Sequence, residues 1–230
     1  MVRASAPITR ERPATDSTSV WAAHYSSGLG FRYWPCEELV RSVAGRRFGT
    51  IVEPGCGNGA NLWLLAEHAD RVIGVDSNRV ALDAAAAYME TRRVSDRVTV
   101  LQGSVTNLPV AAGQADAIVD SMVSQHWPYH EHAEVYREYR RALRPGGWLF
   151  LYHLIDGTTA HGGMTTGSPW TFESLPMLFP DAGLTCLPPV WALGDAMRVA
   201  GFKVSPHRAV TKHYADRQTA MYAVIEGEAV

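Results

Sequence analysis

Apolar and polar residues change their spacing repeatedly along this chain, and the changes predict alternating strands and helices. Short apolar runs bounded by glycine or polar residues are typical of buried strands in a parallel sheet. Apolar residues at helical spacing predict the helices between them. The predicted strands are 50–53, 71–76, 97–101, 115–120, 148–154, 202–210 and 218–226, and the predicted helices are 17–25, 36–46, 61–67, 81–88, 131–143 and 190–200. This order favours an α/β fold, whose last two strands are close enough in sequence to pair antiparallel. Ser77 or Asn78 is predicted to cap the helix that continues over 81–88.

The first strand leads into a turn with glycine at three alternate positions, Gly55, Gly57 and Gly59. Glycine allows positive φ and lets a ligand approach the backbone, and the helix that follows presents free N–H groups to an anionic group. Strand, glycine turn and helix predict a nucleotide-binding unit. Glu53, two residues before the first glycine, would repel a pyrophosphate but suits a cationic ligand, which favours S-adenosylmethionine over NAD. The alternative is a plain tight turn with Glu53 in solvent.

Acidic residues end two further strands. Asp76 ends the second strand, where a carboxylate can accept hydrogen bonds from both hydroxyls of a ribose, a need that NAD and S-adenosylmethionine share. Asp120 and Ser121 follow the fourth strand and are predicted to line the cofactor cleft. Ligands bind beyond the carboxyl ends of parallel strands, so the loop 121–128 is a predicted substrate position.

Composition limits the class of protein. The 230 residues are 47% hydrophobic and 19% charged with a net charge of −2, which fits one globular domain over 1–230. Near-neutral charge argues against a nucleic-acid partner, and no apolar run predicts a membrane span or an export signal. Three widely separated cysteines exclude a zinc knuckle and fit a reducing cytoplasm, so we expect a cytoplasmic protein with no metal.

Two segments are expected to cover the sheet. Residues 1–47 contain a short helix, a dense aromatic stretch and a second helix, and they predict an N-terminal cap. Residues 156–190 are rich in Gly, Thr and Pro without a clear period, and a stretch of this length predicts a lid or an insertion that shapes the substrate site.

Taken together, the motifs resemble those of the class I S-adenosylmethionine-dependent methyltransferases over roughly residues 48–226. The matching pieces are Glu53-x-Gly55-x-Gly57-x-Gly59, Asp76, Leu108-Pro109, Ala115-Asp116-Ala117 and Leu143-Arg144-Pro145-Gly146-Gly147. The resemblance implies a Rossmann-like, doubly wound sheet of seven strands, mostly parallel with one antiparallel strand. It also implies S-adenosylmethionine as the cofactor and S-adenosylhomocysteine as its product. A looser resemblance, through the stretch 33–41, is to bacterial enzymes that methylate small molecules in natural-product biosynthesis.

By position, the resemblance assigns Glu53, Gly55 and Gly57 to the methionine end and Asp76 to the ribose. Ser104 stands where the family often has an aspartate facing adenine, so the adenine contact is expected to shift to backbone groups at Ser104 or Val105. The full predicted cofactor set is Glu53, Gly55, Cys56, Gly57, Asn58, Asp76, Ser77, Ser104, Val105, Asp120, Ser121 and Tyr33.

Methyl transfer to an alcohol needs a proton acceptor, and histidine is suited to this role near neutral pH. His126, past the fourth strand, is the first candidate for a base, and His153, at the end of the fifth strand, is the second. Each has the alternative of a hydrogen-bonded structural histidine. The residues predicted to contact substrate are Tyr25, Trp34, Gln125, Trp127, His24 and His161.

The leading hypothesis is therefore methyl transfer to a small molecule, at oxygen rather than nitrogen because histidines surround the predicted pocket. A methyltransferase acting on a peptide or another macromolecule, a non-catalytic S-adenosylmethionine-binding subunit and, last, a nicotinamide enzyme remain alternatives. The sequence leaves the oligomeric state open, a homodimer included.

Overall fold

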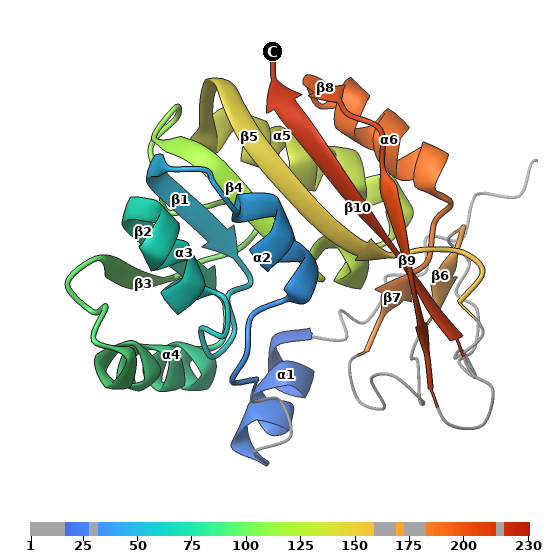
Figure 1. Cartoon of the computed structure of the whole chain (residues 1–230). Helices are drawn as coiled ribbons and strands as arrows, with labels where there is room; N and C mark the ends of the chain where they lie inside the picture. Colours follow the sequence, from blue (N-terminus) through green and yellow to red (C-terminus); the bar gives the residue numbers. More distant parts are fainter. Residues whose placement is uncertain (1–16, 28–31, 159–168, 173–182, 215–218) are drawn as a thin grey trace, which may run out of the picture.

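A mixed β-sheet forms the centre of the protein, for which a computed structural model describes residues 17–27, 32–158, 169–172, 183–214 and 219–230 (Figure 1). The strand order is β3-β2-β1-β4-β5-β10-β8, with β9 also paired to β10. The strands are β1 (Phe48–Pro54), β2 (Ala69–Asp76), β3 (Val98–Gln102), β4 (Ala115–Ser121), β5 (Leu143–Leu154), β8 (Phe202–Val204), β9 (Arg208–His213) and β10 (Thr219–Ala229). The pairs among β1 to β5 are parallel, and β10 runs antiparallel to β5. The predicted Rossmann-like sheet is confirmed.

The sheet has eight strands where seven were predicted. The expected strand 202–210 is divided into β8 and β9, which pair with different parts of β10. Pro206 lies between them and has no N–H to donate to a ladder, and the Ser205 N–H keeps one bond to the Glu226 carbonyl at 2.9 Å. β8 and β9 thus both lie beside β10 at the same edge of the sheet. Counted as one edge position, they leave the seven strands that were predicted.

The stretch Arg144–Gly147 also differs from the prediction. It was expected to be a turn before the fifth strand, but β5 begins at Leu143 and includes it. The pairing with β4 changes register between Ala115 and Ala117, so the exposed residues form a bulge. Gly146, with φ of 72°, accommodates the bend.

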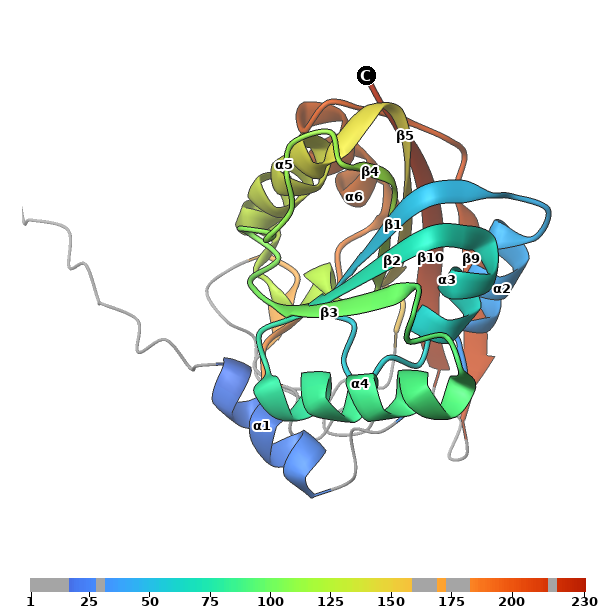
Figure 2. The ribbon, with the colours of Figure 1, turned by 90° about the vertical axis from the view of Figure 1, so that its left-hand side faces the viewer.

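Helices cover both faces of the sheet (Figure 2). α2 (Glu37–Val43), α3 (Leu62–His68) and α4 (Arg79–Arg92) pack on one face, and α5 (His132–Ala142) and α6 (Val190–Val199) on the other. The predicted apolar face of α5 is confirmed, since Val135, Tyr136 and Tyr139 are fully buried. Fully burying one such side chain contributes roughly 1.5–3 kcal/mol, so packing rather than helix propensity holds these layers together.

The remaining elements gather at the carboxyl end of the parallel strands (Figure 1). They are α1 (Ser17–Ser26), the 3-10 turns η1 (Ser124–His126) and η2 (Tyr129–Glu131), and the two-stranded pair of β6 (Thr171–Phe172) with β7 (Thr185–Cys186). β6 and β7 lie within the predicted lid 156–190, while His161 lies outside the described residues. None of the helices within the described ranges is long and apolar enough to cross a membrane.

Asn78 fixes the start of α4, as the sequence predicted for this position or its neighbour. Its side-chain oxygen accepts hydrogen bonds from the N–H groups of Val80 at 2.9 Å and Ala81 at 3.3 Å. Replacing such a cap with alanine typically costs about 1 kcal/mol. We therefore expect Asn78→Ala to lower the free energy of unfolding by about 1 kcal/mol in urea denaturation. Asn78→Ser, which keeps an acceptor oxygen, should recover most of the loss; equal loss in both variants would contradict the capping role.

Candidate active site

The glycine turn between β1 and α3 has the backbone geometry that the sequence predicted. Gly55, Gly57 and Gly59 all have positive φ, at 62°, 54° and 82°. A Cβ at Gly55 would lie 2.6 Å from the Val123 side chain, and one at Gly57 would collide with the Tyr25 hydroxyl. The turn therefore needs glycine both for its conformation and for close contact with its neighbours.

Glu53 lies at the end of β1 with only 2% of its surface exposed. Its Oε1 accepts a hydrogen bond from the Asn61 amide at 2.6 Å, and its buried Oε2 has no hydrogen-bond partner among the described residues. Burial raises the pKa of this carboxyl to about 8. Glu53 thus does not face bulk water, and its second oxygen can accept a hydrogen bond from a cationic group.

Asp76, at the end of β2, connects the glycine turn to the next helix. Its two oxygens accept hydrogen bonds from the N–H groups of Gly57 and Asn78, each at 2.9 Å. Burial raises the pKa of the carboxyl. Each oxygen keeps a further lone pair, so the side chain can still accept bonds from a ligand. The carbonyl of neighbouring Ser77 accepts a bond from Gln102 at 3.0 Å.

The predicted adenine position lies just past β3. The Ser104 hydroxyl forms a 2.8 Å hydrogen bond with the Thr106 hydroxyl and accepts one from the Thr106 N–H at 3.2 Å. Val105 is buried in the core. Ser104 therefore uses its side chain within its own turn, which is consistent with a ligand contact through the backbone.

Two asparagines of the glycine turn hold the N-terminal segment against it. The Asn58 side chain accepts a bond from the Arg32 N–H at 3.1 Å and donates to the Arg32 carbonyl at 2.6 Å. The Asn61 side chain accepts a bond from the Cys36 N–H at 2.8 Å. Asn58 was predicted to contact the cofactor, but its side chain is buried and bound to the backbone of Arg32. Cys56 is likewise buried beside it.

Helix α1 contributes three of the aromatic residues that the sequence singled out. The Tyr25 ring hydroxyl lies against Gly57, and burial raises the pKa of that hydroxyl. His24 packs edge-on to Trp21, whose ring also meets the His126 ring with centroids 5.2 Å apart. Tyr25 was predicted to contact substrate; the structure places it against the cofactor turn instead.

Tyr33 and Trp34 are more exposed than the prediction of a walled pocket implied. The Tyr33 carbonyl accepts a bond from the Tyr88 hydroxyl at 2.6 Å, and its ring meets the Tyr88 ring edge-on. Trp34 is 74% exposed, with the Arg92 guanidinium 5.7 Å from its ring centre. Trp34 nevertheless contributes to the rim of a cavity described below.

Asp120 corrects one prediction. It was expected in the cofactor cleft, but its carboxylate is fully buried beneath the loop that follows β4. It accepts bonds from the N–H groups of Val123 at 2.9 Å and Ser124, and from the Tyr139 hydroxyl at 3.1 Å. Its role is to hold this loop in place. The next residue, Ser121, lies beside the Cys36 thiol at the cavity wall.

Gln125 and His153 are also placed in the core rather than in the cleft. Gln125 is fully buried, and its Oε1 accepts a bond from the Leu154 N–H at 3.2 Å. His153 is fully buried too; its Nδ1 bonds to the Leu154 carbonyl and its ring lies 5.2 Å from the His132 ring. Burial lowers the pKa of His153 well below its ordinary value. The position of His153 therefore matches the alternative stated above, a buried histidine that is hydrogen-bonded to the backbone.

His126 and Trp127 lie in the loop at the carboxyl end of β4. His126 Nδ1 lies 3.1 Å from the Leu184 carbonyl. A carbonyl only accepts, so Nδ1 carries the proton and Nε2 is the basic nitrogen of the neutral ring. Burial lowers the pKa of His126 to about 4. The Trp127 carbonyl accepts a bond from His132 at 3.1 Å, which anchors the loop to α5.

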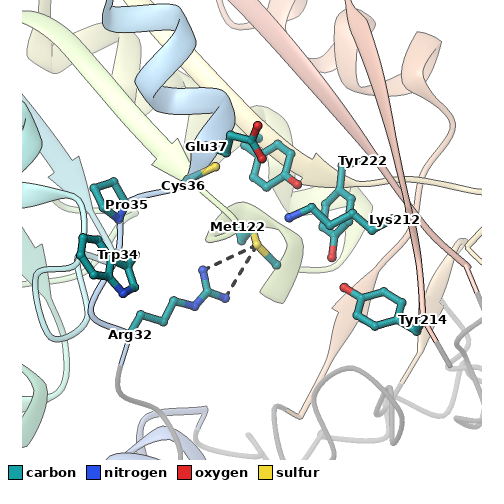
Figure 3. Close-up of a pocket in the computed structure, with 10 residues that line it drawn as sticks. Arg32, Trp34, Pro35, Cys36, Glu37, Met122, Lys212, Tyr214 and Tyr222 are labelled. Carbon is teal, nitrogen blue, oxygen red and sulfur yellow. Dashed lines mark hydrogen bonds between the residues drawn. The ribbon is translucent and has the colours of Figure 1, made fainter.

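A cavity of about 400 Å³ opens beside this loop (Figure 3). Its lining consists of Arg32, Trp34, Pro35, Cys36, Glu37, Met122, Tyr152, Lys212, Tyr214 and Tyr222. Met122 has a φ of 66°, which is unusual for a residue with a side chain. Its sulfur lies 3.8 and 3.9 Å from the two terminal nitrogens of Arg32. The cavity is therefore connected to the glycine turn through Arg32, whose backbone Asn58 holds.

Most of this lining was missed by the sequence analysis, which named only Trp34. Arg32 lies within the aromatic stretch of the predicted N-terminal cap, and its place between Phe31 and Tyr33 was the one indication in the sequence that it could line a pocket. Lys212, Tyr214 and Tyr222 come from β9, β10 and their connection, and only the paired end of the sheet brings them to β5. Within the described residues, no three His, Cys, Asp or Glu side chains gather as a metal site.

A glycine turn and acidic side chains at the carboxyl ends of parallel strands are the arrangement at which α/β proteins of the nucleotide-binding class hold their ligands. Residues 51–147 match the family described as methyltransferase domain. A probable S-adenosylmethionine-dependent methyltransferase of Mycolicibacterium smegmatis is 34% identical over 131 residues, which are 56% of this chain and 46% of that protein. A cypemycin N-terminal methyltransferase of a Streptomyces species is 27% identical over 153 residues, 64% of this chain and 57% of that protein. This chain thus spans about half the length of these curated relatives.

The same fold occurs in a solved S-adenosylmethionine-dependent methyltransferase of Methanosarcina mazei. Its TM-score is 0.70 at 16% identity, over 85% of this chain and 98% of that one. Residues 51–147 are thus similar to a methyltransferase domain, and the fold is that of a solved S-adenosylmethionine-dependent methyltransferase, the class that the motifs resemble.

The buried Glu53 predicts a pH-dependent affinity for S-adenosylhomocysteine, which carries an ammonium group. In the free protein the pKa of Glu53 is about 8, so the carboxyl is protonated below that pH. A bound ammonium would favour the carboxylate, lower its pKa and release a proton. Affinity should therefore fall as the pH is lowered from 8, approaching tenfold per pH unit, in calorimetric titrations between pH 6 and 8.

Glu53→Gln should bind more weakly at pH 8 and lose this pH dependence. Glu67→Gln, a change of the same kind at an exposed site on α3, is the matched control and should keep the profile of the parent. A flat profile in the parent protein would contradict an ionisable contact at Glu53.

Proposed function

We propose that this protein transfers the methyl group of S-adenosylmethionine to a hydroxyl oxygen of a small molecule that occupies the cavity of about 400 Å³. The observation that carries the proposal is the connection between two sites. Glu53, beside the glycine turn, has a buried carboxyl oxygen without a described partner. Arg32, whose backbone is hydrogen-bonded to Asn58 of the same turn, lines the cavity. Cavities of this volume are typical of small-molecule sites.

The residues present fit the amino-acid end of the cofactor. That end carries an ammonium and a carboxylate, and Glu53 and Arg32 offer the complementary charges. The positive charge of Arg32 already acts on Glu53 and lowers its pKa against the larger effect of burial. Among the described residues, Arg32 forms no ion pair with a carboxylate, and its guanidinium hydrogen-bonds only to the weakly accepting sulfur of Met122. Glu53 would hold the ammonium and Arg32 the carboxylate.

The other cofactor contacts follow the strand ends. Asp76 would accept hydrogen bonds from the ribose hydroxyls, and the backbone at Ser104 and Val105 would meet the adenine. Gly55 and Gly57 admit the ligand because they have no side chains, and Tyr25 covers the turn from α1. The cofactor supplies an activated methyl group on a sulfonium. The protein has to align the acceptor behind that methyl group and exclude water, which in model reactions lowers barriers by up to ~7–11 kcal/mol.

An alcohol must lose its proton as the new C–O bond forms, and His126 is our candidate for the acceptor of that proton. It lies four residues beyond Met122, which lines the cavity. Its lowered pKa keeps the ring neutral at pH 7, and Nε2 is the nitrogen that can take a proton. With His153 placed in the core, no second histidine of the predicted pair serves this role.

A peptide or another macromolecule is the alternative acceptor, and one relative is named as an N-terminal methyltransferase. The cavity argues for a small molecule because Lys212 places on its wall a positive charge that the cofactor, as assigned above, does not neutralise. This charge would repel the ammonium of a peptide N-terminus.

The cofactor part of the proposal is tested by titrating the protein with S-adenosylhomocysteine and, separately, with NADH. We expect S-adenosylhomocysteine to bind and NADH not to bind. Asp76→Ala should weaken S-adenosylhomocysteine at least tenfold, because a charged hydrogen bond contributes about 1.5–3 kcal/mol, while circular dichroism shows an intact fold. Unchanged affinity in Asp76→Ala would remove Asp76 from the ribose role, and binding of NADH alone would overturn the family-based proposal.

Methyl transfer itself is tested with labelled S-adenosylmethionine and a panel of hydroxylated, aminated and peptide acceptors. For the best acceptor, His126→Ala should lower kcat about 100-fold, as expected on loss of a general base, with little change in S-adenosylhomocysteine affinity. His130→Ala, in the same loop but exposed, is the control. Normal turnover in His126→Ala would mean that another group, or none, accepts the proton.

A further inference from the structure

Lys212 is a cation on the cavity wall that the proposed cofactor site does not use. It is one of only two lysines in the chain, the other being Lys203. It lies on β9, and its ammonium is 5.3 Å from the ring centre of Tyr222 and 5.9 Å from that of Tyr152. No carboxylate of the described residues forms an ion pair with it. Figure 3 shows Lys212 reaching into the cavity toward Met122, on the side opposite Arg32.

The tyrosines beneath Lys212 form a rigid wall. The rings of Tyr152 and Tyr222 are stacked, with centroids 4.8 Å apart and planes within 16°. Tyr214 also lines the cavity beside them. The Tyr152 side chain, in a residue that is only 2% exposed, lines the cavity, and its hydroxyl has no hydrogen-bond partner among the described residues.

Burial raises the pKa of Tyr152 well above its ordinary value. The hydroxyl therefore stays protonated and keeps a hydrogen to donate. An unpartnered buried hydroxyl is costly, by roughly 1–3 kcal/mol, so a ligand atom that accepts from Tyr152 would recover that loss.

Among the described residues that line the cavity, Glu37 has the one carboxylate, and it does not balance Lys212. Glu37 forms an ion pair with Arg41 at 2.6 Å. Arg32 is assigned to the carboxylate of the cofactor by the proposed function. With the cofactor bound, Lys212 is thus the cation that remains without a described counter-charge, in a chain whose net charge is −2.

We propose that the acceptor carries an oxyanion, a carboxylate or a phosphate, which binds between the Lys212 ammonium and the Tyr152 hydroxyl, apart from the group that is methylated. The proposal rests on the proposed function, because it assigns the cavity to the methyl acceptor. Lys212 on β9 and Tyr152 on β5 both line the cavity, with the ammonium 5.9 Å from the Tyr152 ring centre, and the ammonium and the hydroxyl are both donors. An oxyanion accepts from both and neutralises the charge. An amine or a neutral alcohol would leave Lys212 unbalanced.

The test uses the full chain saturated with S-adenosylhomocysteine and four small probes that share one ring: benzoate, phenyl phosphate, benzyl alcohol and benzylamine. Ligand-observed NMR measures the affinity of each probe. We expect the two anions to bind at least tenfold more tightly than the alcohol and the amine. The tighter of the two anions then identifies a carboxylate or a phosphate as the natural group.

Variants separate this site from the cofactor site. Lys212→Gln should weaken the anions about tenfold, which corresponds to 1.4 kcal/mol, and leave S-adenosylhomocysteine affinity unchanged. Tyr152→Phe removes one oxygen and keeps the stacked ring, so it should weaken the anions severalfold. Lys203→Gln is the matched control because Lys203 is exposed on β8, away from the cavity lining, and it should bind the anions as the parent does.

Equal binding of benzylamine and benzoate would overturn the proposal, and so would anion affinity unchanged in Lys212→Gln or absence of binding by both anions. In those cases S-adenosylhomocysteine still binds, and the proposed function stands without this acceptor class. Failure of S-adenosylhomocysteine to bind the parent protein would overturn the proposed function first, and this proposal with it.

Discussion

The site depends on a carboxyl group that the fold keeps buried with an incomplete set of partners. Glu53 receives one hydrogen bond, from Asn61, and its other oxygen has none within the described part of the chain. Burying such a charged group with few partners costs free energy in the free protein, and burial therefore raises the pKa of Glu53. A cation bound at this carboxyl would relieve the cost. In the free protein the side chains of Val123 and Tyr25 lie against Gly55 and Gly57 of the neighbouring turn.

The same turn also links the two halves of the site. Asn61 bonds to Glu53 on one side and to the N–H of Cys36 on the other, and Asn58 holds the backbone of Arg32. Cys36 and Arg32 both line the cavity. Two asparagine side chains of the turn therefore bind the cavity wall, and Asn61 also binds Glu53 at the end of β1. The physical consequence is that the crevice and the cavity form one structural unit, although they are built from distant segments of sequence.

Sequence reasoning succeeded where the signal is local. The strand, the glycine turn and the cap at Asn78 each depend on a few neighbouring residues, and their geometry is as predicted. It failed where a residue sits on a strand or loop buried on both sides. His153 and Asp120 end apolar strands whose two faces are equally hydrophobic, so the pattern does not tell which face each side chain takes. Both lie in the core. Met122 could not be predicted either, because sequence patterns indicate positive φ mainly through glycine, and this position has a methionine.

The cavity wall formed by Tyr152, Lys212 and Tyr222 could not be predicted for a different reason. Tyr152, Lys212 and Tyr222 are separated by up to 70 residues and meet only because β10 pairs with β5 on one side and with β9 on the other. The motifs that carry the family resemblance end before most of this wall begins, since the matched segment stops at residue 147. In the proposed function, the cofactor binds at the first half of the sheet, whereas the acceptor meets its last strands. For this reason the resemblance to methyltransferases indicates the methyl donor, and the charge and hydroxyl groups of β5, β9 and β10 are the place to look for the acceptor.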